Sequence, residues 1–263
     1  MSRVWLAPLA LLLLALLGPG LAPLDPLDQD LSALNQPLGG AHLLGTDHLG
    51  RDILSRLLAG AGTTLLVAGG GTALALLVGA LAGLVLAATG RWAEALGFAA
   101  IDTLRGLPPL LLGLVGLAAL GPGLMPLVLT LGLSYAPLFA HVARTAWRRE
   151  TSADYVAAAL VNGAGPVRRL ARHILPNAAG PIVTLSAIVL PRCIVTESVL
   201  SFLGLGTAPD APTWGRMAAD AARFAEVAPH ALLAPVLAIA VATAASALAG
   251  DALRRRADPL RAA

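Results

Sequence analysis

Residues 63–88 read TTLLVAGGGTALALLVGALAGLVLAA and contain no charged side chain. A helix that crosses a bilayer needs about 20 mostly apolar residues, so this stretch alone predicts one transmembrane span. Comparable apolar runs follow one another along the rest of the chain, at 4–22, 97–120, 124–144, 178–202 and 229–250. The sequence therefore predicts an all-α integral membrane protein with about six transmembrane helices.

The composition of the 263-residue chain agrees with a lipid environment. Hydrophobic residues make up 57% and charged residues only 13%, with a mean hydropathy of +0.78. Soluble domains usually carry about a quarter charged residues, so a water-soluble fold is excluded. All 18 basic residues are arginines, and a standard phosphate-binding loop requires a lysine. We therefore expect no cofactor bound by this chain, and any ATP to be used by a partner ATPase.

Neither the basic balance nor the single cysteine identifies another class of function. The net charge is +3, but the arginines lie in short segments between apolar runs, which argues against nucleic acid as a partner. Cys193 lies in an apolar run and has no second cysteine with which to form a disulfide. A small buried side chain is the simplest interpretation of that residue.

The arginines predict an orientation in the membrane. Residues 1–22 resemble a secretory signal, but no clear cleavage site follows, so we interpret them as a retained transmembrane anchor. With the N-terminus inside, six spans put 13 arginines on the cytoplasmic side and four, Arg51, Arg56, Arg216 and Arg223, outside. This places both termini of a multi-pass membrane protein in the cytoplasm.

Two segments are too long to be simple turns, and they suggest the domain organisation. Residues 23–62 form an external segment that contains GTDHLGRD at 45–52, followed by helix-forming residues from Ile53 to Ala59. Residues 63–263 then form the main membrane domain, with a cytoplasmic loop at 145–177. The loop is the more informative of the two segments.

Within the loop, the pattern predicts two short helices joined by a tight turn outside the lipid. Thr151 and Asp154 have the spacing of a capping box, and Gly163 is placed to reverse the chain with a positive φ. Pro166 is suited to the first turn of the second helix. Ala157, Ala158 and Ala159 leave a surface with little side-chain bulk, which favours docking against another protein. An amphipathic helix resting on lipid headgroups is the alternative.

The same loop carries a family resemblance. Asp154 to Ala159, then Gly163, then Leu175-Pro176 resembles the EAA loop of ABC-importer permeases. Ala157 stands where that family usually has glutamate, and His173 occupies an isoleucine position.

Further motifs resemble the dipeptide, oligopeptide and nickel permeases of the second-subunit type. These are GTDHLGRD at 45–52, ESVLSFLGLG at 197–206, PTWG at 212–215, GDALR at 250–254 and Asp258-Pro259. They run in order from about residue 42 to the C-terminus, so the combination is far more specific than the loop alone.

The resemblance implies a fold, partners and site residues. A second permease subunit would complete a heterodimer, with two ABC ATPase subunits inside and a substrate-binding protein outside. We expect the cargo to be dipeptides or oligopeptides, with nickel as the alternative. The expected ATPase-coupling residues are Asp154, Tyr155, Ala157, Ala158, Ala159, Gly163 and Pro176. The expected external signature residues are Gly45, Thr46, Asp47, Gly50, Arg51 and Asp52.

Other candidate residues lie inside the predicted spans. Arg192 and Glu197 are costly to expose to lipid, and each either lines the translocation pathway or reaches the headgroups from a helix end. The histidines form no metal-ligand pattern, although His42 and His48 leave a transient external contact open.

Two other classes of function remain open at this stage. An intramembrane serine protease would use Ser134 with His230 as its base. A secondary transporter would need no ATPase partner at all.

Overall fold

The computed structural model describes residues 6–207 and 211–257, and their regular structure is helical apart from two isolated bridges. Residues 1–5 of the predicted anchor and the Asp258-Pro259 motif lie outside the described residues. In order, the elements are α1 (Leu6–Leu17), the 3-10 helix η2 (Gly18–Leu21), α2 (Ile53–Ala88), α3 (Arg91–Arg105), α4 (Pro109–Leu120), α5 (Leu124–Thr151), α6 (Asp154–Val161), α7 (Pro166–Arg169), the π-helix η3 (Leu170–Ile174), α8 (Leu175–Phe202), α9 (Trp214–Ala222) and α10 (Pro229–Ala257).

The described helices confirm a membrane bundle but not a count of six spans. Four helical stretches are long and apolar enough to cross a bilayer: Ile53–Ala88, Leu124–Thr151, Leu170–Phe202 and Pro229–Ala252. The predicted span at 97–120 is instead two helices, α3 and α4, bent by 90° at Leu107-Pro108. Proline restricts its own φ and disfavours helix in the residue before it, which explains a break beside Pro108-Pro109. The first predicted run forms only the short helices α1 and η2.

The centre of the bundle is the packing of α2 against α5. Glycines of α2 face this contact: a Cβ at Gly79 would overlap the carbonyl oxygen of Ala136, and one at Gly83 would overlap that of Ala140. Small residues at this spacing let two helix backbones approach closely in a membrane. Gly79 and Gly83 therefore form a packing surface for α5.

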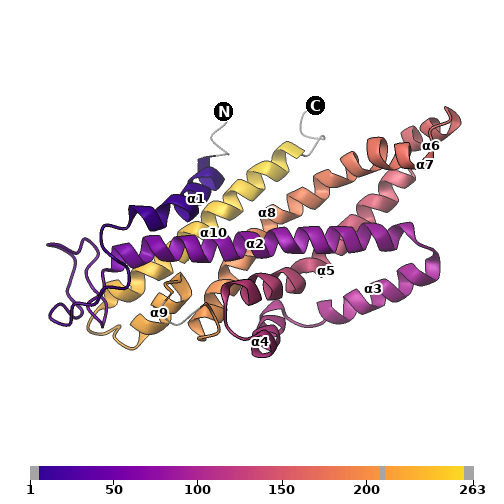
Figure 1. Ribbon diagram of the computed structural model, residues 1–263. Helices are drawn as coiled ribbons and strands as arrows, with labels where there is room; N and C mark the ends of the chain where they lie inside the picture. The colour runs from indigo at the N-terminus through magenta and orange to yellow at the C-terminus, as the bar shows by residue number, and fades with distance from the viewer. Residues whose placement is uncertain (1–5, 208–210, 258–263) are drawn as a thin grey trace.

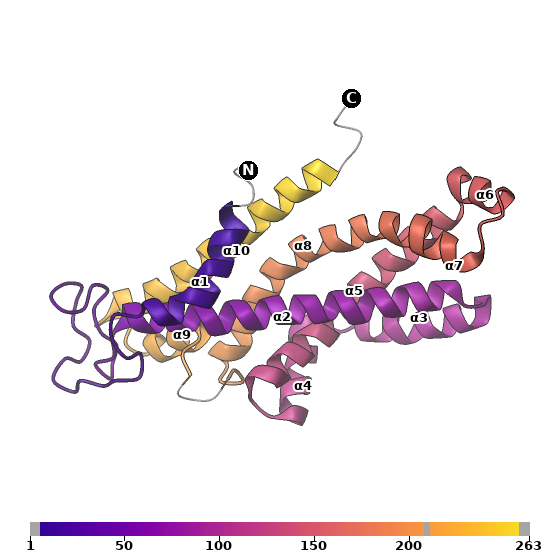
Figure 2. The ribbon, with the colours of Figure 1, turned by 45° about the horizontal axis from the view of Figure 1, so that its top comes forward.

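The long helices run between two structurally different ends (Figures 1 and 2). One end, here called the loop end, carries the irregular segment 22–52 and α9. The other, the α6 end, carries α6, α7 and the turn between α2 and α3. Helices α1 and α10 lie side by side, and each has the end nearer its chain terminus turned away from the loop end (Figure 1).

Two sequence predictions about connecting segments are wrong. The boundary expected between residues 62 and 63 falls inside α2, because Asp52 caps a helix that starts at Ile53 and continues without a break. Thr151 does not begin a capping box either. Its hydroxyl donates to the carbonyl of Trp147, 2.9 Å away, so it belongs to the last turn of α5.

The second short helix of the loop is not a separate surface helix. It begins at Pro166, as predicted, but α7 has only four residues and continues through η3 into α8. Pro176 lies in the first turn of α8 and has no main-chain N–H to donate. The π-helix η3 immediately precedes α8, so the irregular hydrogen bonding occurs next to this proline.

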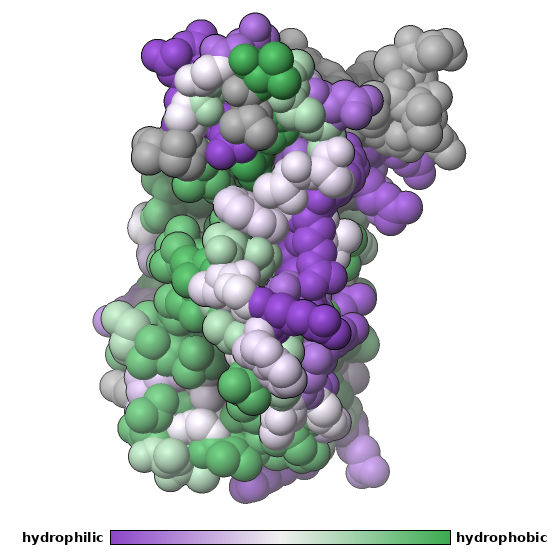
Figure 3. Space-filling model, turned by 90° about the vertical axis from the view of Figure 1, so that its right-hand side faces the viewer, coloured by the Kyte–Doolittle hydropathy of each residue, from purple (hydrophilic) through white to green (hydrophobic). Residues whose placement is uncertain are grey.

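The α6 end is polar where the chain turns. Seen from that end, hydrophilic side chains form a band down the face, with hydrophobic side chains gathered to one side of it (Figure 3). Exposed arginines of this end are Arg91, Arg148, Arg149, Arg168 and Arg172. This distribution is consistent with a polar rim above an apolar bundle.

Candidate functional site

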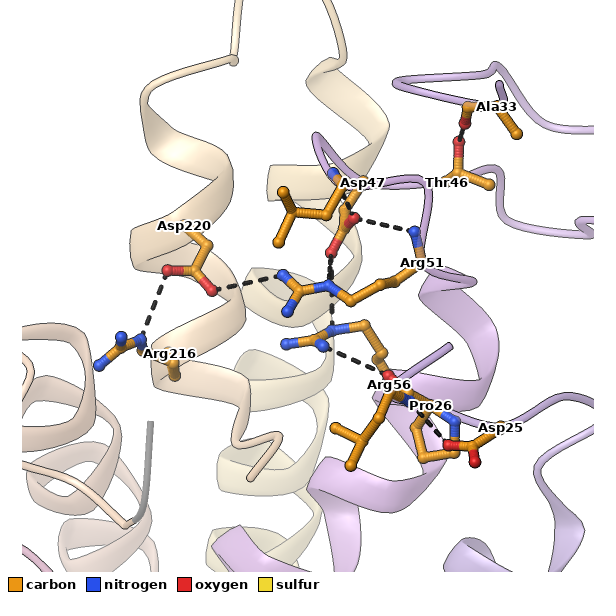
Figure 4. Close-up of polar contacts among 11 residues, drawn as sticks. Asp25, Pro26, Ala33, Thr46, Asp47, Arg51, Arg56, Arg216 and Asp220 are labelled. Atoms are coloured by element: carbon orange, nitrogen blue, oxygen red, sulfur yellow. Dashed lines mark hydrogen bonds and ion pairs between the residues drawn. The ribbon is translucent and has the colours of Figure 1, made fainter. Parts of the chain in front are cut away.

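At the loop end, the signature segment 45–52 folds around the carboxylate of Asp47 (Figure 4). Its Oδ1 accepts hydrogen bonds from the backbone N–H groups of Leu49, at 2.9 Å, and Arg51, at 3.0 Å. Its Oδ2 accepts from Nε of Arg51 at 2.7 Å and lies 3.7 Å from Nε of Arg56. Asp47 thus fixes the turn and neutralises two arginines that are both more than nine-tenths buried.

A second carboxylate connects this segment to α9. Asp220 lies 3.7 Å from Nη2 of Arg51 and 3.4 Å from Nε of Arg216 (Figure 4). The signature and α9 are therefore joined by the guanidinium group of Arg51, which contacts both Asp47 and Asp220. More than 160 residues separate the two segments in sequence.

Thr46 and Asp52 complete the fold of the signature segment. The Thr46 hydroxyl donates to the carbonyl of Ala33 and accepts from the N–H of Gln36 at 2.8 Å. Asp52 caps α2 by accepting from the N–H of Ser55 at 2.8 Å, and its Oδ1 lies 3.0 Å from Nδ1 of His42. Such a cap satisfies a main-chain donor that the first turn of a helix leaves free.

Two signature positions require glycine for two reasons at once. Gly45 and Gly50 have φ of +76° and +74°, a conformation that costs a residue with a Cβ about 1–2 kcal/mol. There is also no room for a side chain. A Cβ at Gly45 would lie 2.7 Å from Nε2 of His230, and one at Gly50 would overlap the backbone of Asp30.

At the α6 end, the turn after α6 confirms the positive φ predicted for Gly163. Its φ is +77°, and the N–H of Ala164 donates to the carbonyl of Ala159 at 2.9 Å. This bond, closing six residues, is the C-terminal motif that a left-handed glycine permits. Nothing lies within 4 Å of a Cβ added at Gly163, so only conformation restricts that position.

The exposed face of α6 has the small side chains that the sequence suggested. Ala157 and Ala158 are exposed, Ala159 is half-buried and Val161 is 88% exposed. Asp154 is exposed in the first turn, where a negative charge suits the helix dipole. Val156 is buried and Pro176 is exposed.

Tyr155 joins α6 to both neighbouring long helices. Its hydroxyl donates to the carboxylate of Glu150 on α5, and it accepts from Nδ2 of Asn177 on α8 at 3.0 Å. Asn177 also donates to the carbonyl of His173 at 2.7 Å. The hydrogen bond to Glu150 raises the pKa of the Tyr155 phenol, so the hydroxyl keeps its proton at physiological pH.

The two predicted pathway residues, both on α8, differ in exposure. Arg192 is exposed on the surface of this chain. Glu197 is fully buried and accepts from the Ser201 hydroxyl of α8 at 2.6 Å, and Thr64 of α2 also contacts its carboxylate. Of the two, only Arg192 could face a pathway formed with another subunit in this conformation.

One residue of the charged cluster, Asp220, was missed from sequence, and the sequence placed Arg56 and Arg216 outside without naming their partners. The signal that could have found Asp220 is the arginine distribution itself. Arginines on the side where few are expected need anionic partners, and Asp220 lies four residues after Arg216 on the same helix face.

The structure contradicts the intramembrane protease. The Ser134 hydroxyl donates to the carbonyl of Thr130 in its own helix, at 2.7 Å. His230 contacts Gly45, which lies just before the start of α2. In contrast, the neighbours of Ser134 on α5 pack against Leu74 and Gly79, in the second half of α2. At 1.5 Å per residue these levels differ by roughly 30 Å, so His230 cannot act as a base for Ser134.

Among the residues that the structure describes, no group of three His, Cys, Asp or Glu side chains is arranged to hold a metal ion. His42 pairs with Asp52, and the ring of His48 stacks on that of Phe224 at 4.8 Å. Both histidines of the loop segment thus have partners within the chain.

Comparisons with known proteins agree on one family and one fold. A family model described as "Binding-protein-dependent transport system inner membrane component" matches residues 75–262. Over 251 residues the chain is 36% identical to the di/tripeptide transport system permease protein DppC of Pseudomonas aeruginosa, covering 93% of this chain and 83% of that relative.

Two solved structures share the fold. The MetNI methionine ABC transporter, in inward-facing conformations, matches with a TM-score of 0.60 and 18% identity, over 77% of this chain and 96% of that one. A structure of an amino acid ABC transporter with histidines matches with a TM-score of 0.54 and 19% identity, over 76% and 94%.

Proposed function

The chain belongs to the family of inner membrane components of binding-protein-dependent transport systems, and on that premise we propose that its cargo is short peptides. It is a permease subunit of an ABC importer and not itself an enzyme, because ATP is hydrolysed on a separate subunit. The observation that carries the peptide proposal is the 36% identity to a di/tripeptide permease across nearly the whole chain. No arrangement of side chains in the described residues favours nickel.

The protein is a multi-pass protein of the inner membrane, and its proposed orientation puts the α6 end in the cytoplasm. The exposed arginines of that end support this, since positive residues in short loops are retained inside. At the loop end, Arg51, Arg56 and Arg216 are each paired with Asp47 or Asp220, which makes them compatible with an external position. Both termini would then be cytoplasmic.

The proposed assembly has four kinds of component: this permease, a second permease subunit, two ABC ATPases and an external substrate-binding protein. In it, α6 is the coupling helix that docks on one ATPase. Its exposed alanines allow a close approach, and Val161 at its end offers an apolar contact.

Tyr155 would carry the movement from that docking helix into the bundle. Only Val156 is buried among the α6 side chains that the structure describes, so packing alone holds α6 weakly. The hydrogen bonds of the Tyr155 hydroxyl to Glu150 and Asn177 reach α5 and α8 together. A shift of α6 during ATPase closure would therefore pull on two spans at once.

Transport into vesicles tests this function directly. The purified permease is reconstituted with its partner permease, with or without the ATPases, and vesicles receive a labelled tripeptide with the external binding protein. We expect uptake only with ATPases and ATP. Uptake without any ATPase would instead identify a secondary transporter, and ATP-dependent uptake of nickel but not of peptides would overturn the peptide proposal.

A further inference from the structure

A cavity of about 410 Å³ opens at the loop end, between α9 and the turn after α8. Its size falls within the range of small-ligand sites. It is lined by His48, Phe202, Leu203, Gly204, Arg216, Ala219, Asp220, Arg223 and Phe224. None of the sequence motifs assigns a role to this cavity, and its mixture of charged and aromatic residues indicates a particular kind of ligand.

The charges around the cavity leave an excess of arginine. Asp220 is already shared between Arg51 and Arg216, at 3.7 and 3.4 Å. Arg223 forms no ion pair with any residue that the structure describes. Other acidic residues of the same end, Asp25, Asp28, Asp30 and Glu226, do not line the cavity, although Glu226 follows Arg223 by three residues. An anionic group entering it would meet guanidinium groups with donors to spare.

The two lining arginines converge on the same space. Seven residues separate Arg216 from Arg223, which puts them on one face of the helical turn, about 10 Å apart along its axis. Arg216 reaches across to the opposite wall, where its Nη1 lies 4.0 Å from the position of a Cβ at Gly204. A planar carboxylate between them would be contacted by donors from more than one direction.

The helix that carries these arginines is held firmly. Trp214 is 2% exposed, and its Nε1 donates to the carbonyl of Leu57 on α2 at 2.9 Å. Its backbone N–H donates to the hydroxyl of Thr64 at 3.2 Å, and Thr213 caps α9. These contacts fix the backbone of α9, on which Arg216 lies and whose C-terminal end Arg223 caps, so both guanidinium groups extend from a positioned support.

The remaining wall is apolar and flat. The ring of His48 stacks on Phe224 with an angle of 11° between the ring planes, and Phe202 and Leu203 are partly exposed beside them. A ligand that fits both parts carries a carboxylate and an adjacent apolar group.

We propose that this cavity binds the carboxylate end of a small organic ligand, with Arg223 and Arg216 holding the carboxylate and the His48–Phe224 pair contacting the neighbouring apolar group. On the proposed function, on which this identification of the ligand rests, that end is the C-terminal residue of an incoming peptide. The cavity would then receive cargo at the external mouth of the permease.

Binding of two matched probes tests the site without requiring transport. N-acetylphenylalanine carries a free carboxylate, and N-acetylphenylalanine amide lacks it. Equilibrium dialysis uses the full-length chain with its co-purifying subunits in phosphatidylcholine nanodiscs. We expect the acid to bind at least about tenfold more tightly than the amide, because a hydrogen bond to a charged group contributes about 1.5–3 kcal/mol.

The substitution Arg223→Gln should remove most of that preference, weakening the acid about tenfold and leaving the amide unchanged. The matched control is Arg91→Gln, an exposed arginine at the α6 end, which should bind both probes as the wild type does. Equal binding of acid and amide by the wild type, or an unchanged preference in Arg223→Gln, would overturn the proposal.

Two further arms separate the alternatives. Anionic phosphatidylglycerol added to the nanodiscs should not displace the acid, and displacement would assign the cavity to a lipid phosphate and refute the carboxylate site. If the wild type binds the acid selectively but vesicles take up no peptide, the cavity proposal stands and the peptide cargo fails. Peptide uptake without selective acid binding would overturn the cavity proposal and leave the peptide cargo in place.

Discussion

The loop end and the α6 end of this permease both reverse the chain at a glycine with φ near +75°, yet they are built in different ways. Around Gly50 the turn is enclosed by the Asp30 backbone and by the buried ion pairs of Asp47. Around Gly163 there is open space, and most α6 side chains are exposed. The first turn is held by packing and charge, whereas the second is free to move as a unit. This difference is consistent with the proposals that the loop end receives cargo and that the α6 end follows an ATPase.

The largest effect is expected from Asp47→Asn. It leaves the buried guanidinium groups of Arg51 and Arg56 without their shared carboxylate, and breaking such a pair typically costs about 3–5 kcal/mol. The purified protein should lose thermal stability by several degrees, measured by size-exclusion fluorescence after heating. Asp28→Asn, at an exposed position of the same loop, is the control and should leave stability unchanged. A stable Asp47→Asn protein would show that the cluster does not hold the loop end together.

A matched pair of substitutions compares the two turns directly. Gly50→Ala adds both backbone strain and overlap with Asp30, for a combined cost of about 2–5 kcal/mol. Gly163→Ala adds strain alone, about 1–2 kcal/mol. The melting temperature should therefore be lowered more by Gly50→Ala than by Gly163→Ala. In Gly163→Ala, ATP-driven uptake should fall although the melting temperature stays nearly normal. Equal melting temperatures in the two variants would contradict the contrast between the ends.

A smaller effect is expected from Tyr155→Phe, which removes one oxygen from α6. The ATPases should remain bound, because the exposed alanine face is intact, but less of their movement would reach α5 and α8. We expect uptake per ATP hydrolysed to drop about two- to tenfold, the range of a single hydrogen bond. Asn162→Ala, whose side chain bonds only within its own helix turn, is the control. Unchanged uptake per ATP hydrolysed would show that the Tyr155 hydroxyl does not transmit the movement of α6 to α5 and α8.

The smallest effect is expected from Ala157→Glu, which introduces the glutamate usual in this family. Position 157 is exposed on α6, so the new carboxylate remains hydrated and no packing is lost. Uptake and ATPase co-purification should both stay within about twofold of the wild type. A protein that no longer binds its ATPases would show that this chain's docking face has adapted to alanine.

Local signals in the sequence predicted much of this structure, and contacts between distant segments account for what was missed. The run at 63–88 was predicted because apolar length is a local signal, and the turn at Gly163 because one residue type dominates that conformation. The ion pair between Asp220 and Arg51 has no such local signal, because neither residue indicates which distant segment packs beside it. The break between α3 and α4 has a local cause in Pro108-Pro109, but the 90° angle of the bend has no comparable local signal.

Helix α2 is longer than a membrane requires. Its 36 residues extend about 54 Å, while the hydrocarbon layer is about 30 Å thick. The apolar run from residue 63 onward already exceeds that thickness and can be fitted by tilting, which leaves residues 53–62, about 15 Å of helix, beyond the acyl chains. Trp214, bonded to Leu57, then lies at headgroup depth, where tryptophan is favoured. A protein approaching the loop end would thus contact a surface that projects beyond the lipid headgroups rather than one level with them.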